Sequence, residues 1–382
     1  MLQEFLDAKP LFYDEIDYRR MPRVYARIKS HFKVPKIIHI IGTNGKGTTG
    51  RFLATALYNR GYSVGHYTSP HILEFNERIW FNGADVRMEI LEKTHQELLA
   101  LLTQEETQSL SYFEYTTLLA MLFFTKESDF VILEAGLGGE YDATAVFANI
   151  LTLVTPIDRD HEAFLGSDIQ SIAKTKLNAI QKTALIAEQK NVMVYSVLRE
   201  IEQAKGIEAL KIRELLDADD RKKIEAIAKN EGLAPYLQNN LALAVGALKY
   251  LKIGYNTKDF ENSRLFGRLT ALEKNILVDV GHNVLAAQSI VESLKNKQYN
   301  LVYNSYKDKN YREILAVLKP VIKRVELIDV YNARVAESTY LQTALEELEI
   351  DYGKFTRVEK DKNYLVFGSF SVVEAFLKVY RG

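Results

Sequence analysis

The octapeptide at residues 42–49, G-T-N-G-K-G-T-T, has the composition of a loop that binds phosphate. It lies between an apolar segment at 37–41, which predicts a buried strand, and a helical pattern at 51–59. Glycines let backbone N–H groups turn toward a phosphate, the amino end of the helix adds partial positive charge, and Lys46 can reach the outer phosphates. The spacing differs from the strict G-x-x-x-x-G-K-S/T pattern, so a chance glycine-rich turn is the alternative. The strand, lysine and helix together favour a nucleotide site.

A carboxylate stands at the end of a second apolar segment. Residues 130–134 predict a strand that ends at Glu134, and a glycine-rich turn follows at 136–139. A carboxylate at the carboxyl end of a parallel strand, beside a phosphate-binding loop, is where nucleotide-hydrolysing proteins hold Mg²⁺. Glu134 is therefore a candidate metal ligand, with a solvated strand end as the alternative.

A lysine lies on the apolar face of the helix that is predicted to begin near residues 166–168. Positions that repeat every three or four residues share one face of a helix, and here they are Ile169, Ile172, Lys176 and Ile180. An unpaired buried ammonium is costly, so Lys176 must reach the solvent, form a pair or lose its proton. The neutral amine can take up carbon dioxide as a carbamate. The spacing alone favours a side chain that reaches the solvent.

A last set of polar residues lies in the carboxyl-terminal third of the chain. Arg268 ends the segment F-G-R, and a predicted strand ends near Asp279, which His282 and Asn283 follow closely. An aspartate at a strand end beside a histidine can hold ribose hydroxyls or place a cation over phosphate. Helix capping by Asp279 or Asn283 is the alternative.

Alternating strand and helix patterns place these residues in an α/β fold with parallel sheets. In the first part of the chain the predicted strands are 37–41, 64–67, 130–134, 151–155, 183–187 and 192–197, and a charged helix is predicted near 217–229. The second series has strands at 276–280, 301–304, 325–330 and 364–367, and helices that begin near 284, 311, 338 and 372. We therefore predict a nucleotide-binding domain at 1–262, a linker at 263–272 and a Rossmann-like domain at 273–382.

The composition excludes several other kinds of site. The chain has 382 residues, with 49 Lys and Arg, 50 Asp and Glu, 7 His and no Cys, so disulfides, thiolate metal sites and thiol nucleophiles are excluded. The net charge of −1 gives no reason to expect nucleic acid or an anionic membrane as a partner. The longest apolar run, 118–124, is far shorter than the ~20 residues of a membrane span, and residues 1–10 lack a signal-peptide core. We expect a soluble, cytoplasmic chain.

Taken in order, the motifs resemble those of the bifunctional bacterial folylpolyglutamate synthase/dihydrofolate synthase family, within the Mur ligase superfamily. Besides residues 42–49, the resemblance rests on S-P-H at 69–71, F-E-Y at 113–115, L-E-A-G-L-G-G at 133–139, D-A-T at 142–144, D-H at 160–161, F-G-R at 266–268, D-V-G-H-N at 279–283 and G-S-F at 368–370. The match extends from the amino-terminal helix to the last βα unit. It implies an ATPase domain of the Mur ligase type followed by a Rossmann-like ligase domain.

The resemblance also implies roles for residues of this sequence. ATP would be bound by Asn44, Gly45, Lys46, Gly47, Thr48, Thr49, Asn240, Arg268 and Asp279. Two Mg²⁺ ions would be held by Ser69, Glu134 and His161, together with a carbamate on Lys176. The pterin part of the substrate would lie against Asp17, Phe113, Tyr141, Asp142 and Ala143. The implied catalytic residues are Lys46, Lys176, His161 and His282.

The sequence departs from the family pattern at several positions. The family commonly has Arg and Asn around D-A-T, where this chain has Glu140 and Ala145. Around the lysine, the usual E-K-A-G-I is T-K-L-N-A at residues 175–179. Val284 replaces a usual Pro, and Ser371 replaces a usual His or Tyr. The chain is also short for the family, and we expect the missing residues between 183 and 235.

The implied reaction joins L-glutamate to dihydropteroate, or to the γ-carboxylate of reduced folates, with ATP as co-substrate and an acyl phosphate as intermediate. Lys46, Arg268 and Mg²⁺ would oppose the charge of the triphosphate and the acid. Closure of the second domain would keep water from the acyl phosphate. The family implies a monomer without nucleic-acid or membrane partners. The alternatives are a Mur-type ligase that acts on another acid, such as a peptidoglycan precursor, and a non-enzymatic nucleotide switch.

Overall fold

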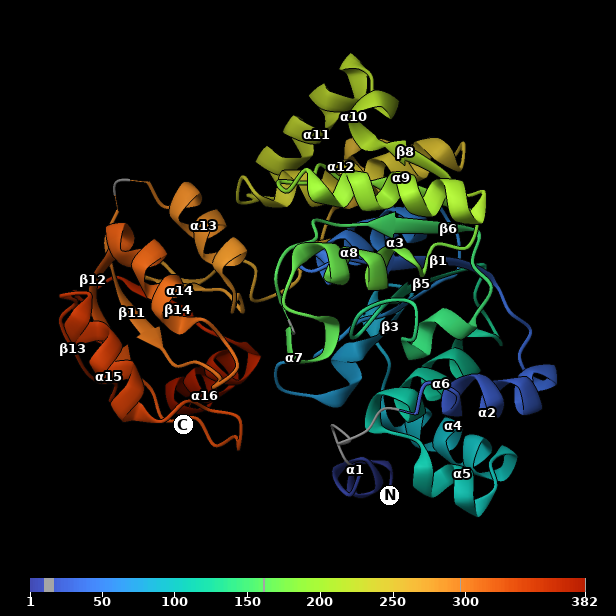
Figure 1. Ribbon diagram of the computed structural model, residues 1–382, viewed down its shortest axis with the longest axis horizontal. Coiled ribbons are helices and arrows are strands. Elements are labelled where there is room, and N and C mark those ends of the chain that lie inside the picture. Colours follow the sequence, from blue (N-terminus) through green and yellow to red (C-terminus); the bar gives the residue numbers. More distant parts are fainter. Residues whose placement is uncertain (10–16, 161, 296, 382) are drawn as a thin grey trace. The chain divides into compact units, whose positions relative to one another are not determined.

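The computed structural model of the chain describes residues 1–9, 17–160, 162–295 and 297–381. It divides into two compact units, which are described separately (Figure 1). The first unit comprises Met1–Glu231 and Asn239–Ser263, and the second comprises Gly232–Gln238 and Arg264–Gly382. Residues 232–238 thus belong to the second unit, although they precede the predicted linker. In the described ranges no helix is long and apolar enough to cross a membrane.

The first unit contains an eight-stranded sheet in the order β4-β3-β2-β5-β1-β6-β7-β8. Its strands are β1 (Lys36–Ile41), β2 (Val64–Tyr67), β3 (Ile79–Phe81), β4 (Ala84–Asp85), β5 (Phe130–Glu134), β6 (Leu151–Val154), β7 (Thr183–Ile186) and β8 (Glu208–Lys211). In this sheet order, neighbouring strands are parallel from β2 onward to β8. The strand β3 pairs antiparallel with both β2 and β4. The continuous apolar sequence of β1 is buried on both faces, as expected for a central parallel strand. Ile40 pairs with Glu134, so β1 ends one residue beyond the end of β5 at the same edge of the sheet.

Helices cover the faces of this sheet (Figure 1). They are α1 (Leu2–Asp7), α2 (Arg20–Ile28), α3 (Lys46–Asn59), α4 (Met88–Leu101), α5 (Gln104–Ser109), α6 (Tyr112–Phe124), α7 (Glu162–Leu165), α8 (Ile169–Leu177), α9 (Met193–Lys205), α10 (Ile212–Leu215), α11 (Ala218–Asn230) and α12 (Leu237–Tyr250), with the 3₁₀ helices η1 (Lys29–His31), η2 (Phe75–Arg78), η3 (Ala143–Val146) and η4 (Thr257–Phe260). One apolar cluster joins α1, α2, α4 and α6 to β1, β2 and β5. A second joins α8 and α9 to β6 and β7.

The second unit contains a six-stranded sheet in the order β13-β12-β11-β14-β10-β9. Its strands are β9 (Thr270–Glu273), β10 (Ile276–Val278), β11 (Tyr299–Tyr303), β12 (Ile322–Leu327), β13 (Tyr352–Lys354) and β14 (Tyr364–Phe367), and its helices are α13 (Val284–Ser293), α14 (Tyr311–Leu318), η5 (Lys319–Val321), α15 (Ser338–Glu347) and α16 (Phe370–Arg381). All pairs are parallel except β9 with β10. Helices and parallel strands alternate along the chain, as in Rossmann-like folds.

The α/β fold predicted from the sequence is confirmed, but one predicted strand is wrong. Residues 192–197 lie in and just before helix α9. Valines at three of these positions favour a strand locally, whereas Val194, Val197, Leu198 and Ile201 are buried on one face of α9 and pack in the cluster with α8. Tertiary packing therefore decided the structure of this segment. The strand β8 was not predicted, because only two of its four residues are apolar. None of the four is buried.

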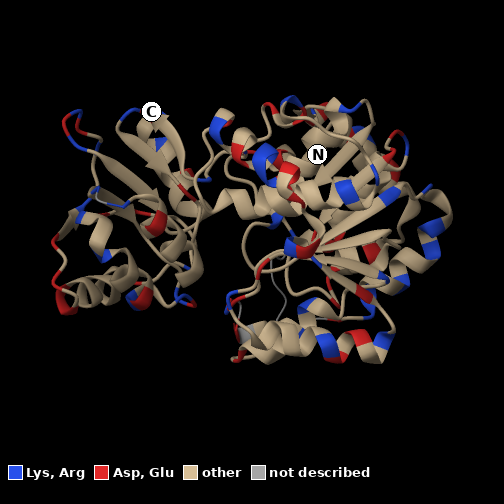
Figure 2. Ribbon diagram, turned by 90° about the horizontal axis from the view of Figure 1, so that it is seen from above, with Lys and Arg blue, Asp and Glu red and all other residues tan. Residues whose placement is uncertain are grey.

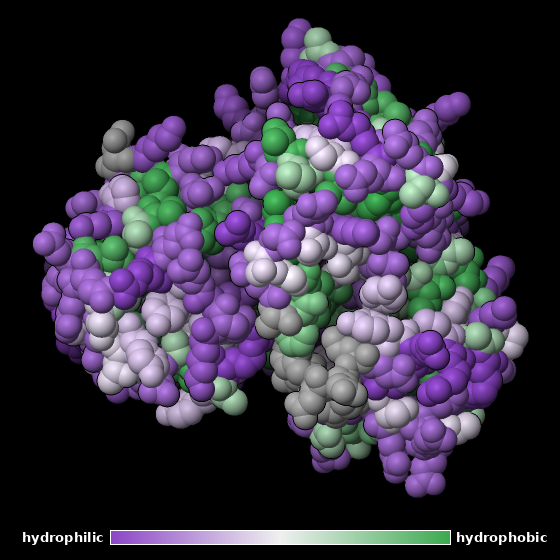
Figure 3. Space-filling model, viewed as in Figure 1, coloured by the Kyte–Doolittle hydropathy of each residue, from purple (hydrophilic) through white to green (hydrophobic). Residues whose placement is uncertain are grey.

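Charge and hydropathy are distributed as on ordinary water-exposed domains. Basic and acidic residues are interspersed along the helices of both units rather than gathered by sign (Figure 2). On the face in Figure 3, hydrophobic residues are scattered among hydrophilic ones. This distribution agrees with the near-zero net charge.

Candidate active site

The phosphate-binding loop, residues 42–49 and hereafter the P-loop, connects β1 to α3. Gly42 and Gly45 have φ of 137° and 88°, which glycine adopts without strain. A Cβ on Gly42 would lie 2.0 Å from Thr155 Oγ1, so this turn also needs a glycine for space. Gly45 is the N-cap of α3, and the helix therefore begins at Lys46 with its free N–H groups at the loop.

Two hydroxyls of the P-loop are buried without a partner. Thr48 Oγ1 and Thr49 Oγ1 make no hydrogen bond to any described residue. Buried hydroxyls are usually paired, because an unpaired one loses its hydrogen bonds to water. Their position at the start of α3 is where phosphate oxygens and a hard cation would supply the missing partners.

Lys46 and Glu134 lie next to each other at the ends of α3 and β5. Lys46 Nζ is 4.0 Å from Glu134 Oε1 and donates hydrogen bonds of 3.3 Å to the carbonyls of Gly42 and Thr43. Glu134 is buried, and it accepts hydrogen bonds from the Thr68 hydroxyl and, at 3.2 Å, from the Ser69 N–H. The structure thus brings Lys46, Ser69 and Glu134 together at the P-loop.

Lys176 extends from α8 to the same loop. Its Nζ donates a 3.1 Å hydrogen bond to the Gly42 carbonyl, and the residue is only 3% exposed. The expectation that this side chain reaches the solvent is therefore wrong, because a carbonyl partner lies inside. Burial is the main reason why the pKa of Lys176 falls from 10.5 to about 7, and the like charge of Lys46 lowers it further.

Asn240 on α12 also lies against the P-loop. A Cβ on Gly45 would be 2.3 Å from Asn240 Oδ1, so the backbone and this buried amide are in close contact. The contact explains why a glycine is required here in addition to its positive φ. The other predicted nucleotide residues of the first unit are members of the P-loop: Asn44, Gly47, Thr48 and Thr49. All the predicted nucleotide residues of this unit therefore lie together.

The predicted substrate residues surround the turn after β5. Asp142 is buried and accepts hydrogen bonds of 2.9 Å from the N–H groups of Gly136 and Leu137, and its other oxygen accepts two from Thr144. Burial raises the pKa of Asp142. A Cβ on Gly136 would be 2.6 Å from the Phe113 ring, so Phe113 packs directly on this turn. Ala143 follows Asp142 in η3 and is buried.

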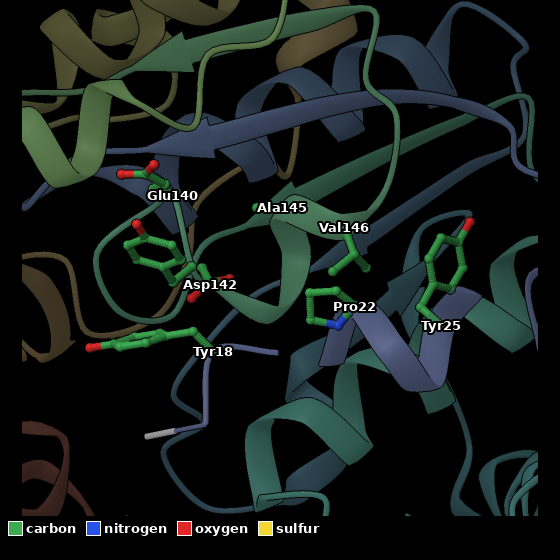
Figure 4. A pocket seen from close by; sticks show the side chains of 8 residues that line it. Tyr18, Pro22, Tyr25, Glu140, Asp142, Ala145 and Val146 are labelled. Carbon is green, nitrogen blue, oxygen red and sulfur yellow. The ribbon is translucent and has the colours of Figure 1, made fainter. Parts of the chain in front are cut away.

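A cavity of about 230 Å³ opens beside this turn (Figure 4). It is lined by Tyr18, Pro22, Tyr25, Glu140, Tyr141, Asp142, Ala145 and Val146. The rings of Tyr18 and Tyr141 lie 4.6 Å apart on one side of it, and both are more than half exposed. Phe113, Asp17 and Ala143 do not line it, although Asp17 is adjacent to Tyr18. Tyr18, Pro22 and Tyr25 were not predicted from the sequence; the available signal was two tyrosines and a proline within eight residues of Asp17.

In the second unit, the predicted nucleotide residues lie around Asp279. Its buried carboxylate accepts hydrogen bonds from the Tyr236 hydroxyl at 2.7 Å, from Leu269 N at 2.8 Å and from Gly281 N at 2.7 Å. Burial raises the pKa of Asp279. Both carboxylate oxygens are thus already bonded to protein donors.

Arg268 and His282 are held by local contacts. Arg268 lies 5.4 Å from the centre of the Phe370 ring and donates to the Gly267 carbonyl at 3.0 Å. His282 Nδ1 lies 3.2 Å from the Val280 carbonyl. Asn283 caps α13 by accepting from Ala286 N, so the capping alternative considered for this residue applies. These residues all belong to the second unit.

One predicted metal ligand, His161, lies outside the described residues. Within the part of the chain that is described, no group of three or more His, Cys, Asp or Glu side chains could hold a metal ion. Glu134 and Ser69 are in contact, and the two unpaired hydroxyls of Thr48 and Thr49 belong to the P-loop whose Lys46 lies beside Glu134. Carboxylate and hydroxyl oxygens are suitable ligands for Mg²⁺, which usually keeps several waters.

Comparison with known proteins decides the family. No protein-family model matches the chain. A dihydrofolate synthase/folylpolyglutamate synthase of Buchnera aphidicola subsp. Schizaphis graminum is 32% identical over 371 residues, with 88% of this chain and 86% of the relative covered. The chain belongs to the dihydrofolate synthase/folylpolyglutamate synthase family. The family predicted from the sequence motifs is therefore confirmed, and the comparisons favour it over both alternatives.

Solved structures of this family have the same fold. Helicobacter pylori folylpolyglutamate synthetase is 37% identical with a TM-score of 0.80, and 100% of this chain and 98% of that chain are covered. E. coli FolC in complex with DHPP and ADP is 26% identical with a TM-score of 0.84, and 99% and 96% of the two chains are covered. Among sequence relatives, a Haemophilus influenzae dihydrofolate synthase/folylpolyglutamate synthase is 29% identical, with 94% of this chain and 92% of the relative covered.

Proposed function

We propose that this chain is an ATP-dependent ligase that joins L-glutamate to dihydropteroate, to the γ-carboxylate of reduced folates, or to both. The names of its relatives give the reaction class. The observation that carries the proposal is the convergence of Lys46, Lys176 and Glu134 on one phosphate-binding loop in a chain of this family. Which of the two acids is used is decided by the assay below.

The chemistry requires activation of the acid. A carboxylate at neutral pH is a poor acyl donor, because its carbon resists attack by an amine. Its oxygen therefore first attacks the γ-phosphorus of ATP, and ADP leaves. The amine of glutamate then attacks the carbonyl carbon of the acyl phosphate, loses a proton and expels inorganic phosphate. Phosphoryl transfer depends on positioning and on charge neutralisation. The N–H groups at the start of α3 and the Lys46 ammonium provide both in this chain.

The oxygen donors at the P-loop fit a divalent metal ion. Glu134, Ser69 and the hydroxyls of Thr48 and Thr49 would hold Mg²⁺, and the two buried hydroxyls without partners support this assignment. Bound Mg²⁺ supplies positive charge to the phosphate oxygens. We propose two such ions, with His161 and Lys176 as further ligands.

Lys176 would contribute as a carbamate. A pKa of about 7 leaves a large fraction of its amine neutral near neutral pH. The neutral nitrogen attacks carbon dioxide and releases a proton, which turns a buried cation into an anion able to hold a metal ion. This change would also remove the repulsion between Lys176 and Lys46.

The cavity beside Asp142 is the site that we propose for the ring system of the acid substrate. Its walls are largely aromatic and apolar, and flat rings pack well against tyrosine. Phe113, which packs on Gly136 of the turn, and Ala143 would complete this end of the site, and Asp17 would approach it from the segment before α2. Because both oxygens of Asp142 are bonded within the turn, this residue shapes the wall.

In the second unit, Arg268, Asp279 and His282 are proposed to act on ATP, as is Asn240 in the first. Arg268 would supply positive charge, and His282 a phosphate contact. Residues 263–272 would act as a linker that allows the second domain to close during turnover, which would exclude water from the acyl phosphate. We propose a monomeric, cytoplasmic enzyme without nucleic-acid partners.

The function is tested by ADP release under three conditions: with dihydropteroate and glutamate, with tetrahydrofolate and glutamate, and without an acid. We expect release in one or both of the first two and little in the third. In a separate reaction with a peptidoglycan precursor as the acid, ADP release that depends on that precursor would support the other ligase class. Equal release in all three conditions would indicate a nucleotide switch and overturn the proposal.

A further inference from the structure

The turn between β5 and η3, residues 135–142, separates the proposed substrate cavity from the helix that carries Lys176. On one side, Glu140, Tyr141 and Asp142 line the cavity. On the other side, Gly138 and Gly139 pack on α8. This β5–η3 turn is therefore a shared wall between the place proposed for the acid and Lys176.

The wall fits closely against α8. A Cβ on Gly139 would lie 2.6 Å from the Lys176 carbonyl oxygen and 3.0 Å from its Cα. The backbone of the turn thus touches the backbone of Lys176 itself. Such an approach is possible only for glycine, and it means that a displacement of the turn changes the surroundings of Lys176 directly.

Glu140 makes two hydrogen bonds that keep the β5–η3 turn against α8. Its backbone N–H donates to the Thr175 carbonyl at 3.0 Å, and its Oε2 accepts from Asn178 Nδ2 at 2.9 Å. Asn178 is itself fixed, because it is the C-cap of α8 and its carbonyl accepts a 2.6 Å hydrogen bond from Lys205 Nζ. The side chain of Glu140 is thus bound to the turn of α8 that contains Lys176.

The connection from Glu140 to the cavity is also short and stiff. Tyr141 follows it directly, and Asp142 closes the turn by binding the N–H groups of Gly136 and Leu137. In Figure 4 the carboxylate of Glu140 points away from the ring of Tyr18, although Glu140 is one of the residues that line the cavity. Glu140 can therefore affect a ligand through the position of the wall.

We infer that Glu140 is a positioning residue: by its hydrogen bond to Asn178 it fixes the cavity wall relative to Lys176, and so sets the place of the acid relative to the P-loop. This inference rests on the proposed function, because it assumes that the cavity binds the acid. Glu140 also lines the cavity, whereas its partner Asn178 does not, so a substitution of Asn178 tests the positioning role apart from any direct contact with the acid. An error of about 1 Å in the placement of a substrate can reduce the rate on the order of 100-fold, so a hydrogen bond at this position can matter.

Three variants separate geometry from charge. Glu140→Ala and Asn178→Ala each remove the hydrogen bond, whereas Glu140→Gln removes the charge but keeps a side-chain oxygen that can accept from Asn178. The matched control is Glu326→Ala in the second unit, because Glu326 accepts from Asn300 Nδ2 at the same distance of 2.9 Å. The control measures what the loss of an amide–carboxylate hydrogen bond does to stability alone.

The readouts are KM for the acid, KM for ATP, the dissociation constant of dihydropteroate measured by calorimetry without ATP, and the melting temperature. We expect Glu140→Ala and Asn178→Ala to raise KM and the dissociation constant for the acid about tenfold, with KM for ATP unchanged within about twofold. The double variant should be no worse than either single one. Glu140→Gln should stay within about threefold of the wild type, and Glu326→Ala should lower only the melting temperature.

The inference is overturned if Glu140→Ala lowers the melting temperature as Glu326→Ala does but leaves the acid constants unchanged. It is equally overturned if Glu140→Gln behaves like Glu140→Ala, because charge and not the hydrogen bond would then be responsible. Failure of the proposed function looks different: the wild type would show no ADP release with either acid. Calorimetry still tests the inference in that case, and a wild type that also binds no dihydropteroate overturns both.

Discussion

Lys46 and Lys176 donate hydrogen bonds to the same backbone oxygen, the carbonyl of Gly42, at 3.3 and 3.1 Å. The two lysines are 130 positions apart in the sequence. Two ammonium groups at one carbonyl repel each other. The repulsion is one reason why the pKa of Lys176 is low. Because the pKa of Lys176 is near neutrality, a change in its protonation changes the charge at the P-loop.

Replacement of Lys176 by alanine should reduce turnover on the order of 100-fold, since it removes the proposed metal-holding carbamate. A small carboxylate such as acetate should restore part of the activity by entering the space that the side chain leaves. The measurement is ADP release with and without acetate. Lys174→Ala is the control, because Lys174 lies on the exposed side of the same helix. Full activity of Lys176→Ala would show that the lysine serves only in packing.

The stability of the ligand-free protein should depend on pH through Lys176. Its pKa is about 7 in the folded protein and near 10.5 in the unfolded chain, so between these values the unfolded state binds more protons. The free energy of unfolding therefore rises with pH in this window, by at most ~1.4 kcal/mol per pH unit from this group. Denaturant titrations of the wild type and of Lys176→Met at about pH 7.5 and about pH 9.5, in buffers free of carbon dioxide, measure the difference. The same slope in both proteins would contradict the low pKa.

Lys46→Ala should abolish ATP turnover without changing the fold. Lys46 is at the first position of α3, where its backbone contribution to the helix remains in the variant and alanine is an excellent helix former. Circular dichroism should be unchanged, and ADP release should fall on the order of 100-fold or more. Retained turnover would mean that the loop at 42–49 is not the nucleotide site.

Tyr141→Ala should weaken the binding of the acid and leave ATP binding unchanged. Tyr141 is 57% exposed, so little burial energy is lost in the free protein, but one wall of the proposed ring site disappears. We expect KM for the acid to rise about tenfold, in line with the loss of an aromatic contact. Tyr340→Ala is the matched control, because Tyr340 is 59% exposed and lies in the second unit. Equal effects of the two substitutions on KM would place the acid elsewhere.

Tyr236→Phe should lower the free energy of unfolding by about 1–2 kcal/mol, because the buried Asp279 loses one of three donors. Tyr255→Phe is a control of the same chemistry in the first unit, where the hydroxyl donates to Asp220 at 2.7 Å in a less buried place. Denaturant titrations give both values. A smaller effect for Tyr236→Phe than for Tyr255→Phe would argue that water or the linker replaces the lost hydroxyl.

Local features of this protein could be predicted from the sequence, and contacts between distant segments could not. The strand, P-loop and helix at 37–59 form one continuous segment, so the apolar run and the glycines suffice to predict them. The partner of Lys176 could not be predicted, because the Gly42 carbonyl is 134 residues away and any backbone carbonyl would have served. For the same reason the spacing argument wrongly placed the ammonium in solvent.

The cavity illustrates the same limit. Tyr18 and Tyr25 lie near Tyr141 because α2 packs on η3, and this packing depends on apolar side chains from several segments. Glu140 and Asn178 were recognised as departures from the family pattern, but their hydrogen bond became visible only in three dimensions. Residues 192–197 show the converse, since a locally strand-like sequence forms a helix once one face is buried.

The division of the chain has a practical consequence for anyone who wishes to study its halves. The polypeptide passes from one unit to the other three times, after residues 231, 238 and 263. A fragment that stops at residue 262 retains Tyr236 but lacks Asp279, its acceptor, and a fragment that starts at residue 264 lacks Tyr236. No single cut in the gene therefore yields two fragments that each contain one complete unit, because residues 232–238 and 239–263 always stay on the same side of such a cut or are divided from their own unit.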